Sequence, residues 1–138
     1  MRHDGDGALL PCFLRGELSN DEFHHADHVR VAWEMLAQYS FVESARLYTE
    51  GLRTLCTKAG RPGAYHETIT IAFLSLVAER MSADMERDFD AFAESNVDLF
   101  DKACLSHWYP ADRLESDVAR RTFILPAPMN PAYSASIR

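Results

Sequence analysis

Apolar residues return at helical spacing along most of the chain, and this periodicity predicts an all-α protein. The first predicted helix runs from about residue 24 to 38, and the residues of its apolar face recur every three or four positions: Val29, Ala32, Trp33, Leu36 and Ala37. The second runs from about residue 41 to 59 and ends at Gly60, where the letters GRPG predict a turn.

The segment YHETITIAFLSLVAERM, residues 65 to 81, carries apolar residues on two rows rather than one. Its clearly polar positions form a narrow strip of Thr68, Ser75 and Glu79. A helix that is apolar around most of its circumference is typical of a position surrounded by other helices. This segment is therefore predicted to be the central helix of a bundle.

Shorter helices are predicted in the second half of the chain. One helix is predicted over residues 84–93, a short one after Asn96, and a last one over the letters DVARRTF. Residues 1–18 are expected to form a flexible start, and residues 124–138, which contain three prolines, an extended tail. Strand-like alternation of any length is missing from the sequence. The expected fold is all-α, a single-domain bundle of five or six helices with an extended C-terminal tail.

The charge balance narrows the classes of function. The 138 residues include 14 Lys and Arg and 21 Asp and Glu, a net charge of −7, whereas a nucleic-acid binder gathers basic residues to displace counterions. No apolar run approaches the roughly 18 to 20 residues of a membrane span, and the first residues lack the apolar core of a signal peptide. Three widely spaced cysteines without a CxxC pair fit a reducing compartment. We therefore expect a cytoplasmic protein with neither nucleic acid nor a membrane as partner.

The stretch FHHADHVRVAW, residues 23–33, holds three of the six histidines of the chain. At about 100° per residue, His25 falls inside the inward stripe of its helix and His28 at the edge, whereas His24 falls outside it. Because residues three apart lie on one helix face, His25 and His28 can converge on one point at the start of this helix.

A second polar pair opens the predicted central helix, where the same count turns His66 and Glu67 toward apolar neighbours. A buried carboxylate needs a cation, hydrogen-bond donors or a raised pKa. One interpretation is a metal site in which His25, His28 and His66 are ligands, with Glu67 as a further ligand, a partner of a ligand or a general base. These groups suit one divalent transition metal: Zn, Fe, Mn or Cu. The alternative is that they satisfy helix N-termini and each other by hydrogen bonds.

Two further pairs of residues are candidates for binding. Trp33 and Tyr65 lie near the proposed site along their helices and could line a substrate pocket, although aromatic residues at this spacing are more often part of a core. Arg120 and Arg121 could hold an anionic ligand, although a solvated pair is the more common arrangement.

Three blocks occur in order along the chain: F-x-H-x-x-H-V-x-V-A-W from Phe23, Y-H-E-T-I-T from Tyr65, and W-Y-P-x-x-R-L-x-S-x-x-A-R-x-x-F-x-x-P from Trp108. Together they resemble a family of short, uncharacterised bacterial helical proteins. The resemblance covers residues 23–126.

The resemblance implies a bacterial protein and points to the same residues as the helical faces do. The first block of the family maps onto His25 and His28, and the second onto His66 and Glu67. The tail of the family often has Pro-Asp where this chain has Ala127 after a proline. The resemblance brings no activity with it.

The expected function is a metal-dependent enzyme that acts on a small-molecule substrate, with a His/Glu site inside the bundle and Glu67 moving protons. The reaction class stays open among hydrolysis, isomerisation or cyclisation, and oxidation. The alternative is a non-catalytic helical module that binds a small molecule or a partner, with structural histidines. A homodimer formed through an exposed apolar strip is a further option.

Overall fold

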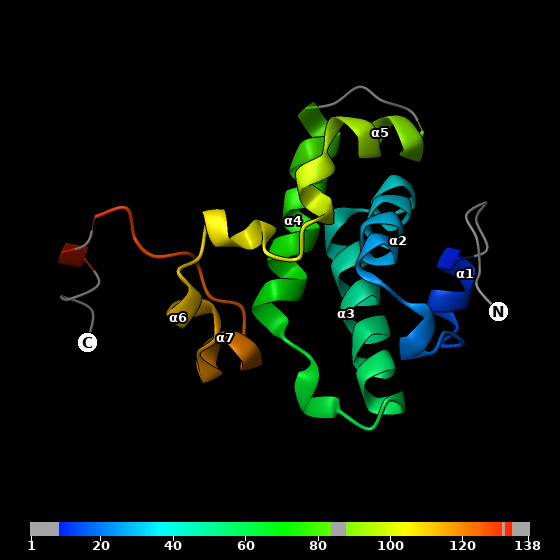
Figure 1. Ribbon diagram of the computed structural model, residues 1–138, viewed down its shortest axis with the longest axis horizontal. Helices are drawn as coiled ribbons and strands as arrows, with labels where there is room; N and C mark the ends of the chain where they lie inside the picture. The colour runs from blue at the N-terminus through cyan, green and yellow to red at the C-terminus, as the bar shows by residue number, and fades with distance from the viewer. Residues whose placement is uncertain (1–8, 84–87, 131, 134–138) are drawn as a thin grey trace.

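The computed structural model describes residues 9–83, 88–130 and 132–133, and all regular structure in these ranges is helical (Figure 1). The all-α prediction is confirmed, with seven α-helices in the described ranges instead of five or six. The α-helices are α1 (Leu9–Leu14), α2 (His25–Gln38), α3 (Phe41–Lys58), α4 (Glu67–Ala83), α5 (Phe89–Ser95), α6 (Ala111–Leu114) and α7 (Asp117–Arg121). The 3₁₀ turns are η1 (Asn20–Glu22), η2 (Pro62–Ala64), η3 (Val97–Phe100) and η4 (Cys104–His107).

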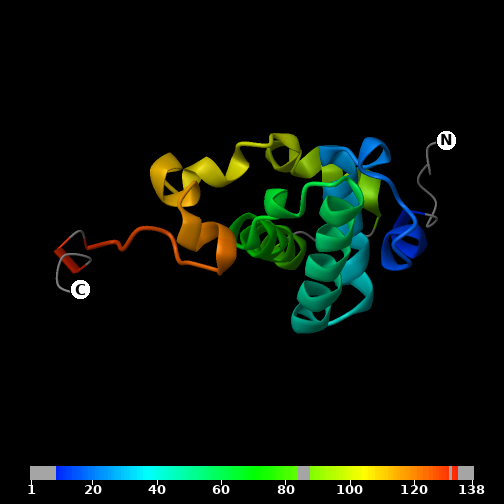
Figure 2. The same ribbon diagram turned by 90° about the horizontal axis from the view of Figure 1, so that it is seen from below.

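Helix α4 lies at the centre of the molecule, so its predicted position is confirmed. It packs against α2 and α3 as well as against α7 and η4, and both views show it between these two groups (Figures 1 and 2). Its residues Phe73 and Leu74 are buried, and burial of such a side chain contributes roughly 1.5–3 kcal/mol. Thr68, which falls on the predicted polar strip, is also buried. Its hydroxyl bonds to the backbone of the C-terminal segment, which covers this part of α4.

The beginning of the chain differs from the expectation of a flexible segment over residues 1–18. Residues 9–14 form α1, which packs on α2 and α3 and buries two leucines and Phe13. Gly51 of α3 permits this contact, because a Cβ there would overlap the Phe13 ring. A helix of six residues is too short for a periodic pattern to reveal. Residues 1–8 lie outside the described part of the chain.

The region after α4 also departs from the prediction. Helix α5 begins after Asp88, whose carboxylate accepts a hydrogen bond from Ala91 N at 2.8 Å, and the predicted start at Asp84 lies outside the described residues. Two 3₁₀ turns, η3 and η4, replace the short helix predicted after Asn96. The Asn96 side chain donates to Phe92 O at 2.9 Å, and such local bonds from short polar side chains compete with helix continuation.

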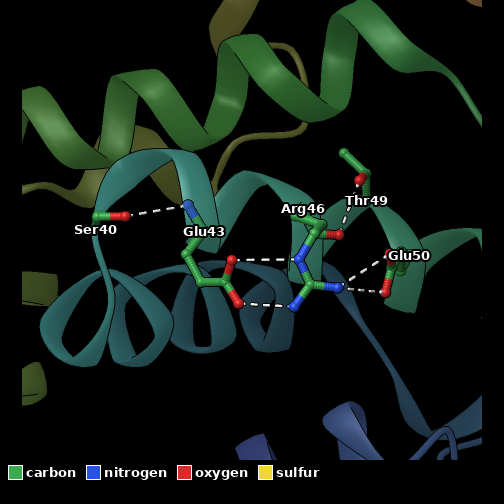
Figure 3. Close-up of polar contacts among 5 residues, drawn as sticks. All are labelled: Ser40, Glu43, Arg46, Thr49 and Glu50. Carbon is green, nitrogen blue, oxygen red and sulfur yellow. Dashed lines mark hydrogen bonds and ion pairs between the residues drawn. The ribbon is translucent and has the colours of Figure 1, made fainter.

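The start of α3 is a solvated charged face (Figure 3). Ser40 Oγ caps the helix by accepting a hydrogen bond from Glu43 N at 3.2 Å. Arg46 lies between two carboxylates, at 2.7 and 3.2 Å from Glu43 and 3.3 Å from Glu50. The hydrogen bond from Arg46 lowers the pKa of Glu43. Because these side chains are exposed, their ion pairs add little stability.

The C-terminal segment lies on the opposite side of α4 from α1 (Figure 1). Helices α6 and α7 pack together and α7 packs on α4. Residues 124–130 contain no helix, so the predicted extended tail is confirmed for them. Ile124 and Leu125 still bond to the bundle, and the chain after them runs away from it (Figure 1). Within the described ranges, no helix is both long and apolar enough to span a bilayer.

Candidate functional site

A pocket of about 480 Å³ lies where the first turns of α2 and α4 face the middle of α3 and the chain around η4. This volume is large enough for a small organic molecule. The residues that line it are Phe23, His24, His25, His28, Tyr48, Leu52, Ile69, Thr70, Phe73, Lys102, Cys104 and Leu105. We call it the histidine pocket.

His25, the first residue of α2, is oriented by the backbone of η3. Its Nε2 lies 2.9 Å from Leu99 O. A carbonyl oxygen only accepts, so Nε2 carries the proton and Nδ1 is left with a lone pair. The His25 ring also packs against Phe73, with ring centroids 5.6 Å apart. The fold thus anchors one ring nitrogen of His25, and the other makes no hydrogen bond to the described residues.

His28 lies one turn further along α2 and packs between aromatic rings. Its ring centroid is 4.4 Å from that of Phe23 and 6.0 Å from that of His25. Burial, and after it the neighbouring His25, lowers the pKa of His28 to about 4. Its imidazole is therefore neutral at physiological pH.

The His28 ring is available to a molecule in the pocket. No hydrogen bond joins its ring to another described residue. His28 is one of the residues that line the pocket, so its ring nitrogens are candidates for hydrogen bonds to a molecule bound there.

Tyr48 of α3 supplies a third polar group by the same reasoning. Its side chain is only 1% exposed, and its hydroxyl bonds to none of the described residues. Tyr48 lines the pocket, so its hydroxyl is a further candidate to bond a molecule there. Burial raises the pKa of Tyr48, so the hydroxyl keeps its proton.

The electrostatic character of the pocket differs from that of the acidic chain. Its lining, within the described residues, includes no Asp or Glu and one cation, Lys102. Burial raises the pKa of the Cys104 thiol, so Cys104 is no activated nucleophile. Leu52, Ile69 and Leu105 make part of the wall apolar. The pocket therefore suits a neutral or anionic molecule with an apolar body.

His66 directly precedes α4 and is part of the fold rather than of the pocket. Its Nδ1 accepts a hydrogen bond from Ile69 N at 3.1 Å, as an N-cap does. Its Nε2 donates to Leu114 O at 2.7 Å. Both ring nitrogens are therefore occupied, one in starting α4 and one in holding α6 against it.

Glu67 is also directed away from the histidine pocket. Its Oε1 accepts a hydrogen bond from the Tyr65 hydroxyl at 2.6 Å and lies 3.3 Å from the Arg53 guanidinium. Tyr65 lines a different hollow. Trp33, the other predicted pocket residue, packs against Phe89 and lines no part of the histidine pocket.

The structure thus brings together two of the four predicted metal ligands, His25 and His28, and places His66 and Glu67 elsewhere. Within residues 9–83, 88–130 and 132–133, no group of three or more His, Cys, Asp or Glu side chains is close enough to hold a metal ion.

Several pocket residues were not identifiable from the sequence. Tyr48 falls on the inward face of its helix, a position that core packing explains. Thr70 lies on α4, and its hydroxyl donates to His66 O at 2.7 Å. Lys102 and Cys104 carry no local signal, because the 3₁₀ turns that bring them to the pocket replace a predicted helix.

Comparison of the chain with family models, curated proteins and solved structures finds no match.

Proposed function

We propose that this protein binds a small molecule in the histidine pocket. One observation carries the proposal: three side chains that line one hollow, His25, His28 and Tyr48, have polar atoms that bond to none of the described residues. Polar groups of a folded interior are nearly always paired. A ligand with a hydrogen-bonding group would pair with all three, while its apolar part would lie against the leucine and isoleucine side of the wall.

A screen of small-molecule fragments by ligand-detected NMR tests this proposal. The untagged protein is compared with Tyr48→Phe and His28→Gln, and with the matched surface variants Tyr39→Phe and His107→Gln. We expect the pocket variants to weaken binding about tenfold, the value of one good hydrogen bond, and the surface variants to bind normally. Equal binding by all five proteins would contradict the proposal.

Thermal unfolding of Tyr48→Phe separates binding from stability. The Tyr48 hydroxyl bonds to none of the described residues, so its removal should leave the melting temperature unchanged or slightly raised. A loss on the order of 1 kcal/mol, the usual contribution of a hydrogen bond, would mean that the hydroxyl serves the fold instead.

A second candidate is metal-dependent catalysis on the bound molecule. The observation that favours it is the bond from His25 Nε2 to the Leu99 carbonyl, because metal-ligating histidines usually donate their other ring N–H in this way. His25 Nδ1 and His28 would hold one divalent transition metal (Zn, Fe, Mn or Cu), with further positions open to water and substrate. Such a metal would act as a Lewis acid.

The reactive role of His28 in such an enzyme would be that of a ligand rather than of a base. With a pKa of about 4, its imidazole would hold a proton about once in a thousand molecules at pH 7, whereas a metal ligand must be neutral. Glu67 would take no part, because its carboxylate is bound to Tyr65 and Arg53. Catalytic zinc sites usually have three protein ligands, whereas the pocket offers two histidines for this role. Small-molecule binding is therefore favoured over metal-dependent catalysis.

Titration of the untagged protein with Zn²⁺ and Co²⁺ tests the metal alone. We expect one equivalent to bind, to be lost in His25→Ala and His28→Gln, and to persist in His66→Asn. Weak binding without saturation, or equal binding by all four proteins, would reject the metal and leave the fragment screen to decide on the pocket.

A further inference from the structure

A second hollow lies between the end of α3, η2 and α7, and it shares no lining residue with the histidine pocket. Its volume is about 410 Å³. We call it the arginine hollow, and its lining consists of Arg53, Thr57, Pro62, Gly63, Tyr65, Arg120 and Arg121.

Guanidinium groups from two separate elements face this hollow. Arg53 of α3 lies with its guanidinium carbon 4.4 Å above the centre of the Tyr65 ring. Arg120 and Arg121 come from the last turn of α7, and Arg120 donates to Gly63 O at 3.2 Å. Like charges gathered in one place repel each other, and the chain as a whole is acidic with a net charge of −7.

The protein neutralises this cluster only in part. Glu67 pairs with Arg53, at 3.3 Å. Arg120 contacts a neutral carbonyl, and Arg121 bonds to none of the described residues. Two of the three positive charges therefore have no carboxylate beside them in the described part of the chain.

The helix dipole of α7 accounts for two of the three arginines in the hollow. Cations are favoured at the last turn of a helix, which accounts for Arg120 and Arg121 on α7. It does not account for Arg53, which reaches the same hollow from α3 and is held there by the Tyr65 ring and Glu67. An anion in the hollow would balance the charge from both sides.

We infer that the arginine hollow binds a phosphorylated small molecule. The planar guanidinium fork matches the oxygens of a phosphate in a bidentate arrangement. The Thr57 side chain is a further hydrogen-bond donor in the lining. The hollow is larger than one phosphate group requires, and Tyr65 offers the rest of a ligand an aromatic wall. The phosphate binds to Arg120 and Arg121, and the rest of the molecule lies toward Arg53 and Tyr65.

Calorimetric titration at low ionic strength tests this site in the untagged, full-length chain. The probes are inorganic phosphate and adenosine monophosphate, with sodium chloride at matched ionic strength as the reference. Arg121→Gln is the main variant because it removes a charge without removing a hydrogen bond or ion pair to the described residues. Arg120→Gln is the second, and Arg46→Gln, on the exposed start of α3, is the matched control.

We expect saturable binding that weakens about tenfold in Arg121→Gln and Arg120→Gln, as loss of one charge-assisted hydrogen bond predicts, and that is unchanged in Arg46→Gln. Tighter binding of the monophosphate than of phosphate would assign the site to a phosphate ester, and equal binding would assign it to phosphate itself. Binding that does not saturate, that chloride reproduces, or that falls equally in Arg46→Gln would overturn the inference.

Discussion

The starts of α2 and α4 present similar side chains to the interior of the bundle but differ in what those side chains bind. At the start of α2, one ring nitrogen of His25 and both ring nitrogens of His28 make no hydrogen bond to the described residues. At the start of α4 the polar groups are bonded within the protein: Tyr65 to Glu67, His66 to Ile69 and Leu114, Thr68 to Thr122 and Ile124, and Thr70 to His66.

This difference distinguishes a polar cluster that stabilises the fold from a candidate binding site. Three of the six bonds of the α4 cluster go to backbone atoms of the C-terminal segment, so the cluster attaches this segment to the bundle. The histidines at the α2 start line a cavity instead. Histidines open both helices, but His66 is buried and fully bonded, whereas His25 and His28 are half-buried and keep ring nitrogens unbonded to the described residues.

The largest expected effect is that of His66→Ala. This substitution removes the N-cap of α4 and leaves the Leu114 carbonyl without its donor, which together should lower the free energy of unfolding by about 3 kcal/mol. Urea denaturation measures the loss. His66→Asn should recover about half of it, because asparagine caps a helix but is too short to reach Leu114. A loss below about 1 kcal/mol would contradict a structural role for His66.

Thr68→Val should have the next largest effect. The Thr68 hydroxyl donates to Thr122 O at 2.7 Å and accepts from Ile124 N at 3.1 Å, and valine has the same shape without these bonds. We expect a loss of about 2 kcal/mol, measured by urea denaturation. Thr54→Val on the exposed face of α3 is the control. If hydrogen exchange at Ile124 were as slow in the variant as in the wild type, Thr68 would not hold the C-terminal segment.

Acid should destabilise the protein through His28. Its folded-state pKa, about 4, lies below the usual value near 6.5 that the unfolded chain has. The unfolded state therefore binds the proton first as the pH falls, and stability present above pH 6.5 is lost toward pH 4. Between pH 7 and pH 5 we expect a loss of about 2 kcal/mol that is missing in His28→Asn. Identical pH profiles for the two proteins would show that His28 titrates normally.

His28→Ala at pH 7 should have the smallest effect on stability. The ring makes no hydrogen bond to the described residues and loses only its packing against Phe23 and His25, so we expect about 1 kcal/mol or less. Urea denaturation next to His66→Ala compares the two histidines directly. Equal losses would remove the distinction between the two helix starts.

The sequence was sufficient for the long helices and for one half of the candidate site. Helices α2, α3 and α4 have enough turns for their apolar faces to recur, and the angle between His25 and His28 follows from helical spacing alone. Helix α1 was missed because six residues hold too few turns. The helix predicted after Asn96 was wrong because Asn96 bonds locally to Phe92 O.

The partners of the histidines could not be predicted, because they are distant in the sequence. His25 binds Leu99 O across 74 positions, and His66 binds Leu114 O across 48. Helical angle showed that His25 and His66 both face inward. It could not show that both ring nitrogens of His66 are bonded within the protein while His25 and His28 line a cavity. That difference depends on the path of the C-terminal half of the chain.

The most direct test of the difference between the two helix starts is the solvent exchange of the histidine ring protons, measured by long-range ¹H–¹⁵N NMR at pH 7. The ring proton of His66 should lie on Nε2 and exchange slowly, because it is bonded to Leu114 O. The ring proton of His28 should exchange at least tenfold faster, because the ring makes no hydrogen bond to the described residues. Equal protection of the two protons, or faster exchange at His66, would contradict the assignment of the α2 start as the binding site.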